Sequence, residues 1–200
     1  MLAYLQMFWK YLPALLMGLK YTLIIAVAGI FTAIVLGIIL CIFSICGNRV
    51  LGKIAGVYIT VVRGIPLMIL ALFLYFGVIK NALTLVASAI IILAINASAY
   101  MAEIFRAGIQ AIDFGQMEAS RSLGLSYFQA MRKIILPQAI KIMIPSLMNQ
   151  FISSLKDTAI LSAISVPELT MTAKVIIAKT TRRLRFIPMP RLSIWSSLRF

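Results

Sequence analysis

The feature that most constrains this chain is a set of long apolar stretches with almost no charged residues. Residues 22–46 and 82–102 carry none, residues 57–79 carry only Arg63, and a shorter uncharged stretch covers residues 142–155. About 20 apolar residues suffice for a helix to cross a bilayer. Hydrophobic residues make up 62% of the chain, and a soluble protein of this length has too little interior to bury so many apolar side chains. We therefore predict an all-α, polytopic membrane protein with about four transmembrane helices.

Positive charge is concentrated between the apolar stretches. The chain has 19 lysines and arginines against 5 acidic residues, a formal net charge of +14. In a soluble protein this excess would suggest nucleic-acid binding, but cytoplasmic loops of membrane proteins also collect lysine and arginine. The basic residues favour the exits of the first and third predicted spans. We therefore place those exits in the cytoplasm and the N-terminus outside, and we predict no nucleic-acid partner.

The sequence lacks the residue patterns that enzymes and metal sites require. It has no histidine, which is the commonest general base and metal ligand. Its two cysteines, Cys41 and Cys46, lie within an apolar stretch and have neither metal nor redox spacing. The phosphate-loop pattern G-x-x-x-x-G-K-[ST] does not occur. We predict a non-catalytic chain with no metal or cofactor of its own.

The tetrapeptide RGIP, residues 63–66, interrupts the second apolar stretch. A glycine followed two positions later by a proline breaks or bends a helix. Broken helices occur in membranes where the backbone lines a cavity or is covered by protein. Two interpretations of Arg63, Gly64 and Pro66 stay open, namely a structural break within the membrane and a helix that begins at a loop.

A polar interval between residues 113 and 137 separates the third and fourth apolar stretches. Its pattern predicts two short helices joined at Gly124, where glycine suits a left-handed turn. Pro137 fits the first turn of the helix that follows. Such a helix pair can press into a groove on another protein, or it can lie as an amphipathic pair on the membrane surface. The pattern by itself leaves both interpretations open.

The spacing of this interval resembles the EAA loop of ATP-binding-cassette (ABC) importer permeases. That loop reads here as Glu118-Ala119-Ser120, three residues, Gly124, nine residues, and then Ile134-x-Leu136-Pro137, with Ser120 where the family has alanine. The segments RGIP, AEIFRAGIQAI and NQFISSLKDTAILSAISVPELT are similar to the polar amino-acid branch, the permeases of histidine, glutamine and arginine uptake. The resemblance covers about residues 15–178.

This resemblance implies the transmembrane domain of an importer permease (MetI-like) over residues 1–178, in the bacterial inner membrane. The coupling loop, about residues 113–137, would dock onto separate ABC ATPase subunits, which bind ATP and magnesium. A second permease copy or a similar subunit would complete a dimer, and a periplasmic or lipid-anchored binding protein would deliver the amino acid. The docking residues implied are Glu118, Ala119, Ser120, Gly124, Ile134, Leu136 and Pro137.

Charged residues inside membrane segments are costly, so their default interpretation is functional. We expect a carboxylate such as Asp157 or Glu103 to hold a substrate ammonium or guanidinium group, and an amide to orient the substrate carboxylate. The alternatives are an ion pair between Lys156 and Asp157, and a structural role for Glu103 and Arg106. The candidate substrate-pathway residues are Asn96, Glu103, Arg106, Asn149, Gln150, Lys156, Asp157 and Thr158.

Residues 179–200 depart from the family, whose members continue with a last transmembrane helix. This segment has six basic residues, two prolines and no acidic residue. One arginine near the centre of a span costs about 2.5–3.5 kcal/mol on insertion scales, so we predict a divergent basic tail that is not a transmembrane helix. We interpret it as the product of a shift in reading frame near Thr180. The alternative is a genuine basic tail that binds anionic lipid.

Two rival functions use the same features. A secondary carrier driven without ATP would also contain broken helices and intramembrane polar residues, but it would not explain the EAA pattern. An inactive remnant that occupies a complex without transporting would fit the divergent tail. Co-purification with a soluble ATPase distinguishes the permease from the carrier.

Overall fold

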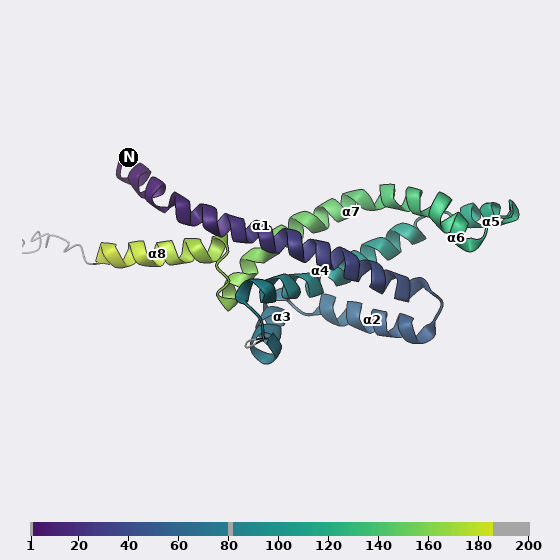
Figure 1. The fold of residues 1–200 in the computed structure, drawn as a ribbon, viewed down its shortest axis with the longest axis horizontal. Coiled ribbons are helices and arrows are strands. Elements are labelled where there is room, and N and C mark those ends of the chain that lie inside the picture. The colour runs from purple at the N-terminus through teal and green to yellow at the C-terminus, as the bar shows by residue number, and fades with distance from the viewer. Residues whose placement is uncertain (1, 80–81, 186–200) are drawn as a thin grey trace, which may run out of the picture.

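A computed structural model describes residues 2–79 and 82–185, which form helices joined by short turns with no β-strand among them. Figure 1 shows an elongated molecule in which α4 runs alongside α1. The elements in chain order are α1 (Leu2–Ile45), α2 (Arg49–Gly64), α3 (Leu67–Leu74), the π-helical turn η1 (Tyr75–Ile79), α4 (Leu85–Gln110), α5 (Phe114–Ser122), α6 (Tyr127–Ala130), the π-helical turn η2 (Met131–Ile135), α7 (Leu136–Asp157), the 3-10 helix η3 (Thr158–Ile164) and α8 (Leu169–Arg185).

The described helices supply up to four membrane spans, in agreement with the number predicted. Two single helices are long and apolar enough to cross a bilayer, residues Gln6–Ile45 of α1 and the whole of α4. Two bent pairs reach the same length and hydropathy when each is taken as one span. In the first pair α2 meets α3–η1 at 108°, and in the second Tyr127–Ile164 meets Leu169–Thr181 at 48°.

The first two spans differ from their predicted bounds. The stretch predicted over residues 22–46 forms only the second half of α1, which begins at Leu2 and includes Pro13. The stretch 57–79 is not one helix, because α2 begins earlier, at Arg49, and ends at Gly64. The Asn48 side chain sets this start by accepting hydrogen bonds from the backbone N–H groups of the first helical turn. The start of α2 is therefore set by the cap at Asn48 and not by the start of the apolar stretch.

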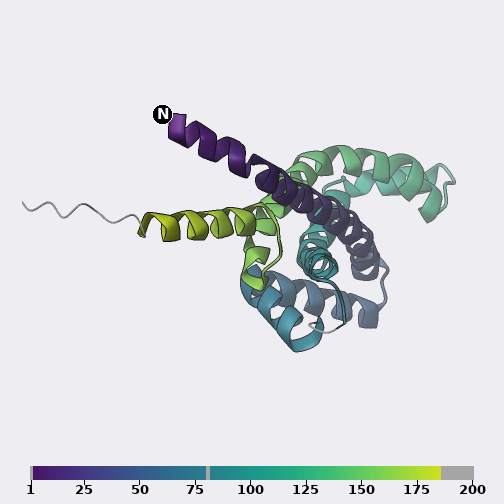
Figure 2. The same cartoon turned by 60° about the vertical axis from the view of Figure 1, so that its left-hand side comes forward.

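Helix α4 is the centre of the fold, with α1, α2 and α7 around it (Figure 2). Buried Ile25, Ile92 and Leu93 belong to its main core with α1. The two helices run in parallel and approach closely at Gly37, where an added Cβ would lie 2.7 Å from the Met101 Cβ and 3.1 Å from a backbone nitrogen. Small residues allow such close packing of membrane helices, where dispersion contacts replace the hydrophobic effect.

The RGIP tetrapeptide forms a true break between two helices. Helix α2 ends at Gly64, Ile65 is extended with φ −98° and ψ 128°, and Pro66 precedes the first residue of α3. Proline fixes its own φ and disfavours the helical conformation in the residue before it, so the chain turns at this point. The bend of 108° means that α2 and α3 do not form one straight span.

The polar interval folds as the predicted pair of short helices joined at Gly124. The Asp113 side chain caps α5 by accepting from the Gly115 N–H at 2.7 Å. Gly124 has φ +85°, the left-handed conformation that glycine adopts without a steric penalty. Ser126 and Gln129 then form a reciprocal capping box that begins α6.

Pro137 lies in the first turn of α7, as predicted, but no loop precedes it. Helix α6, the π-helical turn η2 and α7 follow one another without interruption over residues 127–157. The 22 residues of α7 span about 33 Å at 1.5 Å per residue, close to the thickness of the bilayer core. One helical run therefore joins the polar interval to the far end of α7.

The first residue of α8, the last described helix, is hydrogen-bonded to α1. The Thr22 hydroxyl accepts a hydrogen bond from the Leu169 N–H at 3.1 Å. The buried Glu168 carboxylate caps α8 by accepting from the backbone N–H groups of Thr170 and Met171, at 2.8 and 2.6 Å. A carboxylate at this position also interacts favourably with the positive end of the helix dipole.

Helix α8 continues to Arg185, across the domain boundary predicted at residue 178. Residues 179–185 of the predicted basic tail are therefore helical. Residues 186–200 lie outside the described residues. The boundary, the absence of a transmembrane helix in the tail and the shift in reading frame stay predictions.

Candidate functional site

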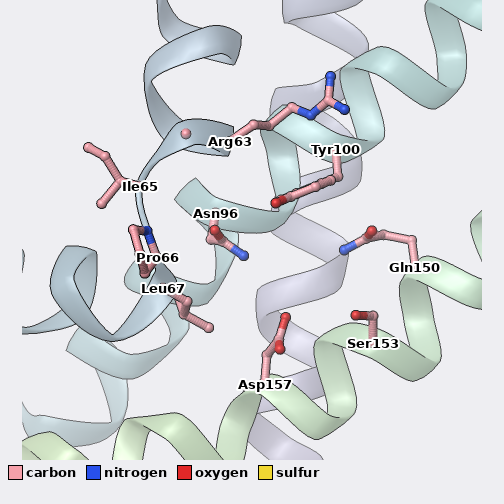
Figure 3. A pocket seen from close by; sticks show the side chains of 10 residues that line it. Arg63, Ile65, Pro66, Leu67, Asn96, Tyr100, Gln150, Ser153 and Asp157 are labelled. Carbon is pink, nitrogen blue, oxygen red and sulfur yellow. The ribbon is translucent and has the colours of Figure 1, made fainter.

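The break between α2 and α3 borders a polar cavity of about 400 Å³, which we call the first cavity (Figure 3). The break supplies one wall, α4 supplies a second and α7 a third. Its lining residues are Arg63, Gly64, Ile65, Pro66, Leu67, Asn96, Tyr100, Gln150, Ser153 and Asp157. Because three different spans contribute, any relative movement of these spans changes the shape of the cavity.

The α7 wall is one face of the helix. Gln150, Ser153 and Asp157 follow the spacing i, i+3, i+7, which places them on one side. Gln150 is positioned by its Nε2, which donates to the Ser154 Oγ at 3.2 Å. The neighbouring candidates Asn149 and Lys156 fall off this face, and both side chains are exposed.

The Asp157 carboxylate lies half-buried at one end of the first cavity. In the described part of the chain it has no hydrogen-bond or ion-pair partner, and it forms no salt bridge with Lys156. Figure 3 shows the amides of Asn96 and Gln150 between Asp157 and Tyr100, each directed into the cavity. A negative group and two amides therefore face the same space.

A second cavity of about 590 Å³ lies between α2, α4 and the end of α1. Its charged residues are Arg63, Glu103 and Arg106. The Arg106 Nε donates to the Glu103 Oε2 at 3.2 Å, its Nη2 also donates to the Oε1, and its Nη1 donates to the Gln110 Oε1 at 2.9 Å. The remaining lining residues are Ser44, Gly52, Gly56, Ile59, Thr60, Gly64 and Tyr100.

The structure separates the predicted substrate-pathway residues into three groups. Asn96, Gln150 and Asp157 line the first cavity, together with the predicted break residues. Glu103 and Arg106 line the second cavity. Asn149, Lys156 and Thr158 line neither, and the buried Thr158 hydroxyl donates to the Leu155 carbonyl at 2.7 Å.

Sequence reasoning missed Tyr100 and Ser153, which line the first cavity. A helical-spacing argument could have found both. Tyr100 is four residues after Asn96, and Ser153 is three residues after Gln150, so each shares a helix face with a predicted residue. Arg63 was predicted only as part of the break, yet it lines both cavities.

The predicted docking residues lie in the interval α5–α6, in η2 and at the start of α7. The α5–α6 interval projects at the end of the molecule away from α8 (Figure 1). Glu118 and Ala119 are exposed, whereas Ser120 is buried and its hydroxyl donates to the Gln116 carbonyl. Large apolar side chains are exposed around them, namely Phe114, Leu123, Tyr127 and Phe128. Exposed apolar side chains in such a polar interval are consistent with an interaction surface.

A helical membrane subunit with a broken span beside a polar cavity is typical of transport proteins. The sequence matches the family described as the binding-protein-dependent transport system inner membrane component, over residues 33–185. The chain belongs to this family and is a permease component of a membrane transport system. This membership favours the permease interpretation over a secondary carrier.

Individual relatives that the chain resembles are also named as permeases. The chain is 39% identical to the probable amino-acid ABC transporter permease protein YckA of Bacillus subtilis, over 82% of this chain and 74% of that protein. It is 36% identical to the glutamine transport system permease protein GlnP of Escherichia coli, over 95% of this chain and 85% of that protein.

Solved structures agree in fold. A crystal structure of an amino acid ABC transporter with histidines superposes with a TM-score of 0.81 at 40% identity, covering 86% of this chain and 82% of that chain. An inward-facing form of the MetNI methionine ABC transporter superposes with a TM-score of 0.63 at 18% identity, covering 90% and 92%. The latter likeness concerns the fold alone, and it agrees with the MetI-like transmembrane domain predicted.

Proposed function

We propose that this chain is the permease subunit of an ABC importer and that it carries a polar or basic amino acid through the first cavity. The observation that carries the proposal is the Asp157 carboxylate, which faces this cavity without a partner among the described residues. An unpaired charge within a membrane protein is costly and is functional by default. The named amino-acid specificities of the relatives support the same substrate class.

Asp157 binds the positive group of the substrate, either the ammonium or a guanidinium. Charge-assisted hydrogen bonds of this kind are about twice as strong as neutral ones. The amides of Asn96 and Gln150 lie beside Asp157 and orient the rest of the molecule by donating and accepting hydrogen bonds. Apolar Ile65 and Leu67 line the same cavity and contact the aliphatic part of the substrate.

The α5–α6 interval docks onto a separate ATPase subunit. Exposed Glu118 supplies a charge, and exposed Phe114, Leu123 and Phe128 supply apolar contact area. The uninterrupted helical run over residues 127–157 links this surface to Asp157, so a displacement at the docked end is carried to the cavity wall. Transport is therefore driven from outside the chain, which has no catalytic role of its own.

The complete importer contains further components. A pair of ATPase subunits binds ATP and magnesium, a second permease copy or a similar subunit completes the pathway, and a periplasmic or lipid-anchored protein delivers the amino acid. The N-terminus faces outward, and the α5–α6 interval faces the cytoplasm. The excess of lysine and arginine after α1 and α4 supports this orientation.

Uptake by the complete importer in liposomes tests the cavity. Labelled L-glutamine, L-arginine and L-histidine are the probes, and Asp157→Asn is compared with Lys156→Gln. The control removes the charge from the neighbouring exposed residue, which lies outside both cavities. We expect Asp157→Asn to lower uptake about tenfold or more, the equivalent of losing one charge-assisted hydrogen bond. Equal uptake by the two variants would contradict the role of Asp157.

Capture of the ATPase from membranes tests the docking surface. The variant Glu118→Lys reverses an exposed charge within the α5–α6 interval, and Lys141→Glu reverses an exposed charge on α7 beyond it. We expect the ATPase to co-purify with the native chain and with Lys141→Glu, and to be lost with Glu118→Lys. If Glu118→Lys still retained the ATPase, the ATPase would have to dock on another surface of the chain.

A further inference from the structure

The two cavities share one wall. Arg63, Gly64 and Tyr100 line the first cavity and the second cavity alike. Gly64 has no side chain, so the shared wall consists of the Arg63 guanidinium and the Tyr100 ring. The Arg63 guanidinium carbon lies 5.4 Å from the centre of that ring, within the range of a cation–π contact.

The positive charge of Arg63 is poorly balanced. Its nearest carboxylate oxygen is the Glu103 Oε1, 4.0 Å from its Nη1, at the outer limit of an ion pair. The same Glu103 oxygens accept two hydrogen bonds from Arg106, which therefore neutralises Glu103 more directly. The Arg63 side chain is 42% exposed. Arg63 thus presents hydrogen-bond donors that are free to bind an incoming anion.

The position of Arg63 complements that of Asp157. Figure 3 shows the Arg63 guanidinium beyond the Tyr100 ring at one end of the first cavity, Asp157 at the other end, and the amides of Asn96 and Gln150 between that ring and Asp157. An α-amino acid at neutral pH carries one negative and one positive group. These two groups share one carbon, so the cation and the anion at opposite ends of the cavity match a basic amino acid, whose second positive group lies at the far end of its side chain. A planar guanidinium binds a carboxylate through two parallel hydrogen bonds.

We propose that Arg63 determines specificity by binding the carboxylate of the transported amino acid from the wall that the two cavities share. This rests on the proposed function of the first cavity as the substrate site. Because the same side chain lines the second cavity, the substrate passes between the cavities with its carboxylate still bound. When the substrate leaves, Arg63 returns to Glu103. Arg63 therefore binds substrate in addition to lying in the last turn of helix α2.

Binding of an amino acid and of its carboxamide separates this role from a structural one. The carboxamide replaces the carboxylate with a neutral group and keeps the ammonium. The purified permease–ATPase complex, without the binding protein, is titrated with L-glutamine, L-arginine and L-histidine and with their carboxamides. Uptake by the complete native importer is measured in parallel. The variants are Arg63→Gln, Arg63→Lys and the control Lys53→Gln, which removes an exposed charge from the same helix outside both cavities.

We expect the native complex to bind at least one amino acid about tenfold more tightly than its carboxamide, the ratio that one charge-assisted contact supplies. Lys53→Gln keeps this ratio, Arg63→Lys keeps part of it, and Arg63→Gln lowers it to near unity. The proposal would be overturned if the native complex bound each amino acid and its carboxamide equally tightly. It would also be overturned if Arg63→Gln kept the ratio of affinities that the native complex shows. If the native importer neither takes up nor binds any of the three amino acids, the proposed function itself fails.

Discussion

The two sides of α4 perform opposite tasks with the same backbone. On the side toward α1, Ala97 and Met101 are buried in close apolar packing, with Gly37 pressed against Met101. On the side toward α2 and α7, Tyr100 and Glu103 line open polar cavities. Asn96, only 5% exposed, lies at the inner edge of the first cavity. One side packs the helix against α1, and the other presents polar groups to the two cavities.

This difference shows how a membrane subunit holds charges without losing its fold. Charged residues are tolerated here because they line cavities instead of facing lipid, and Glu103 and Arg106 also pair with each other. If this division is correct, changes to the packed side alter stability most, and changes to the open side have smaller effects on stability and larger ones on transport.

The largest effect on stability is expected at the packed side. Gly37→Leu places side-chain atoms where a Cβ alone would lie 2.7 Å from the Met101 Cβ. Overpacking of this kind costs about 1–3 kcal/mol and occasionally more, and we expect about 3 kcal/mol because backbone lies close as well. Thermal unfolding in detergent measures the loss. The matched control Gly56→Leu has no atom within 4 Å of its Cβ, so an equal loss there would contradict the comparison.

An intermediate effect is expected on the open side. Glu103→Gln removes the carboxylate that accepts from Arg106 and leaves two arginines beside one cavity without a negative partner. We expect a loss of about 1–2 kcal/mol, below that of a fully buried pair because the Glu103 side chain is 30% exposed. Thermal unfolding at low and high salt measures it. Arg49→Gln, at the exposed start of α2, should leave stability unchanged.

The smallest effect is expected where α2 meets α4. The Tyr58 hydroxyl donates to the Ile95 carbonyl at 3.1 Å and lies 2.9 Å from the Ser98 Oγ. Tyr58→Phe keeps the ring and removes these contacts, which should lower stability by about 0.5–1 kcal/mol. A much larger loss in the same unfolding experiment would mean that α2 is part of the packed side, and the division of the fold would then have to be redrawn.

The local features of the fold were predictable because each depends on neighbouring residues. Apolar runs identified α1 and α4, glycine identified the left-handed turn at Gly124, and the glycine–proline pair identified the end of α2. The bounds were less predictable. Lys10, Pro13 and Lys20 interrupt the apolar pattern before residue 22, yet α1 begins at Leu2. The cap at Asn48 places the start of α2 at Arg49.

The composition of the candidate site was predictable only in part. The sequence pointed to Gln150 and Asn149 together, and to Lys156 and Asp157 together, because adjacent residues have the same membrane depth. Only one of each pair lines a cavity. The choice depends on how α7 is rotated about its axis, which its packing against α4 sets.

The sequence by itself determined that this chain is a helical membrane protein and to which family of transport subunits it belongs. These properties follow from residue types and their spacing along the chain. The tertiary structure decided that Asp157 has an open face, that Glu103 and Arg106 pair beside a second cavity, and that Arg63 lies between both cavities. Such relations join residues on different helices, and only helix packing fixes their distances and directions.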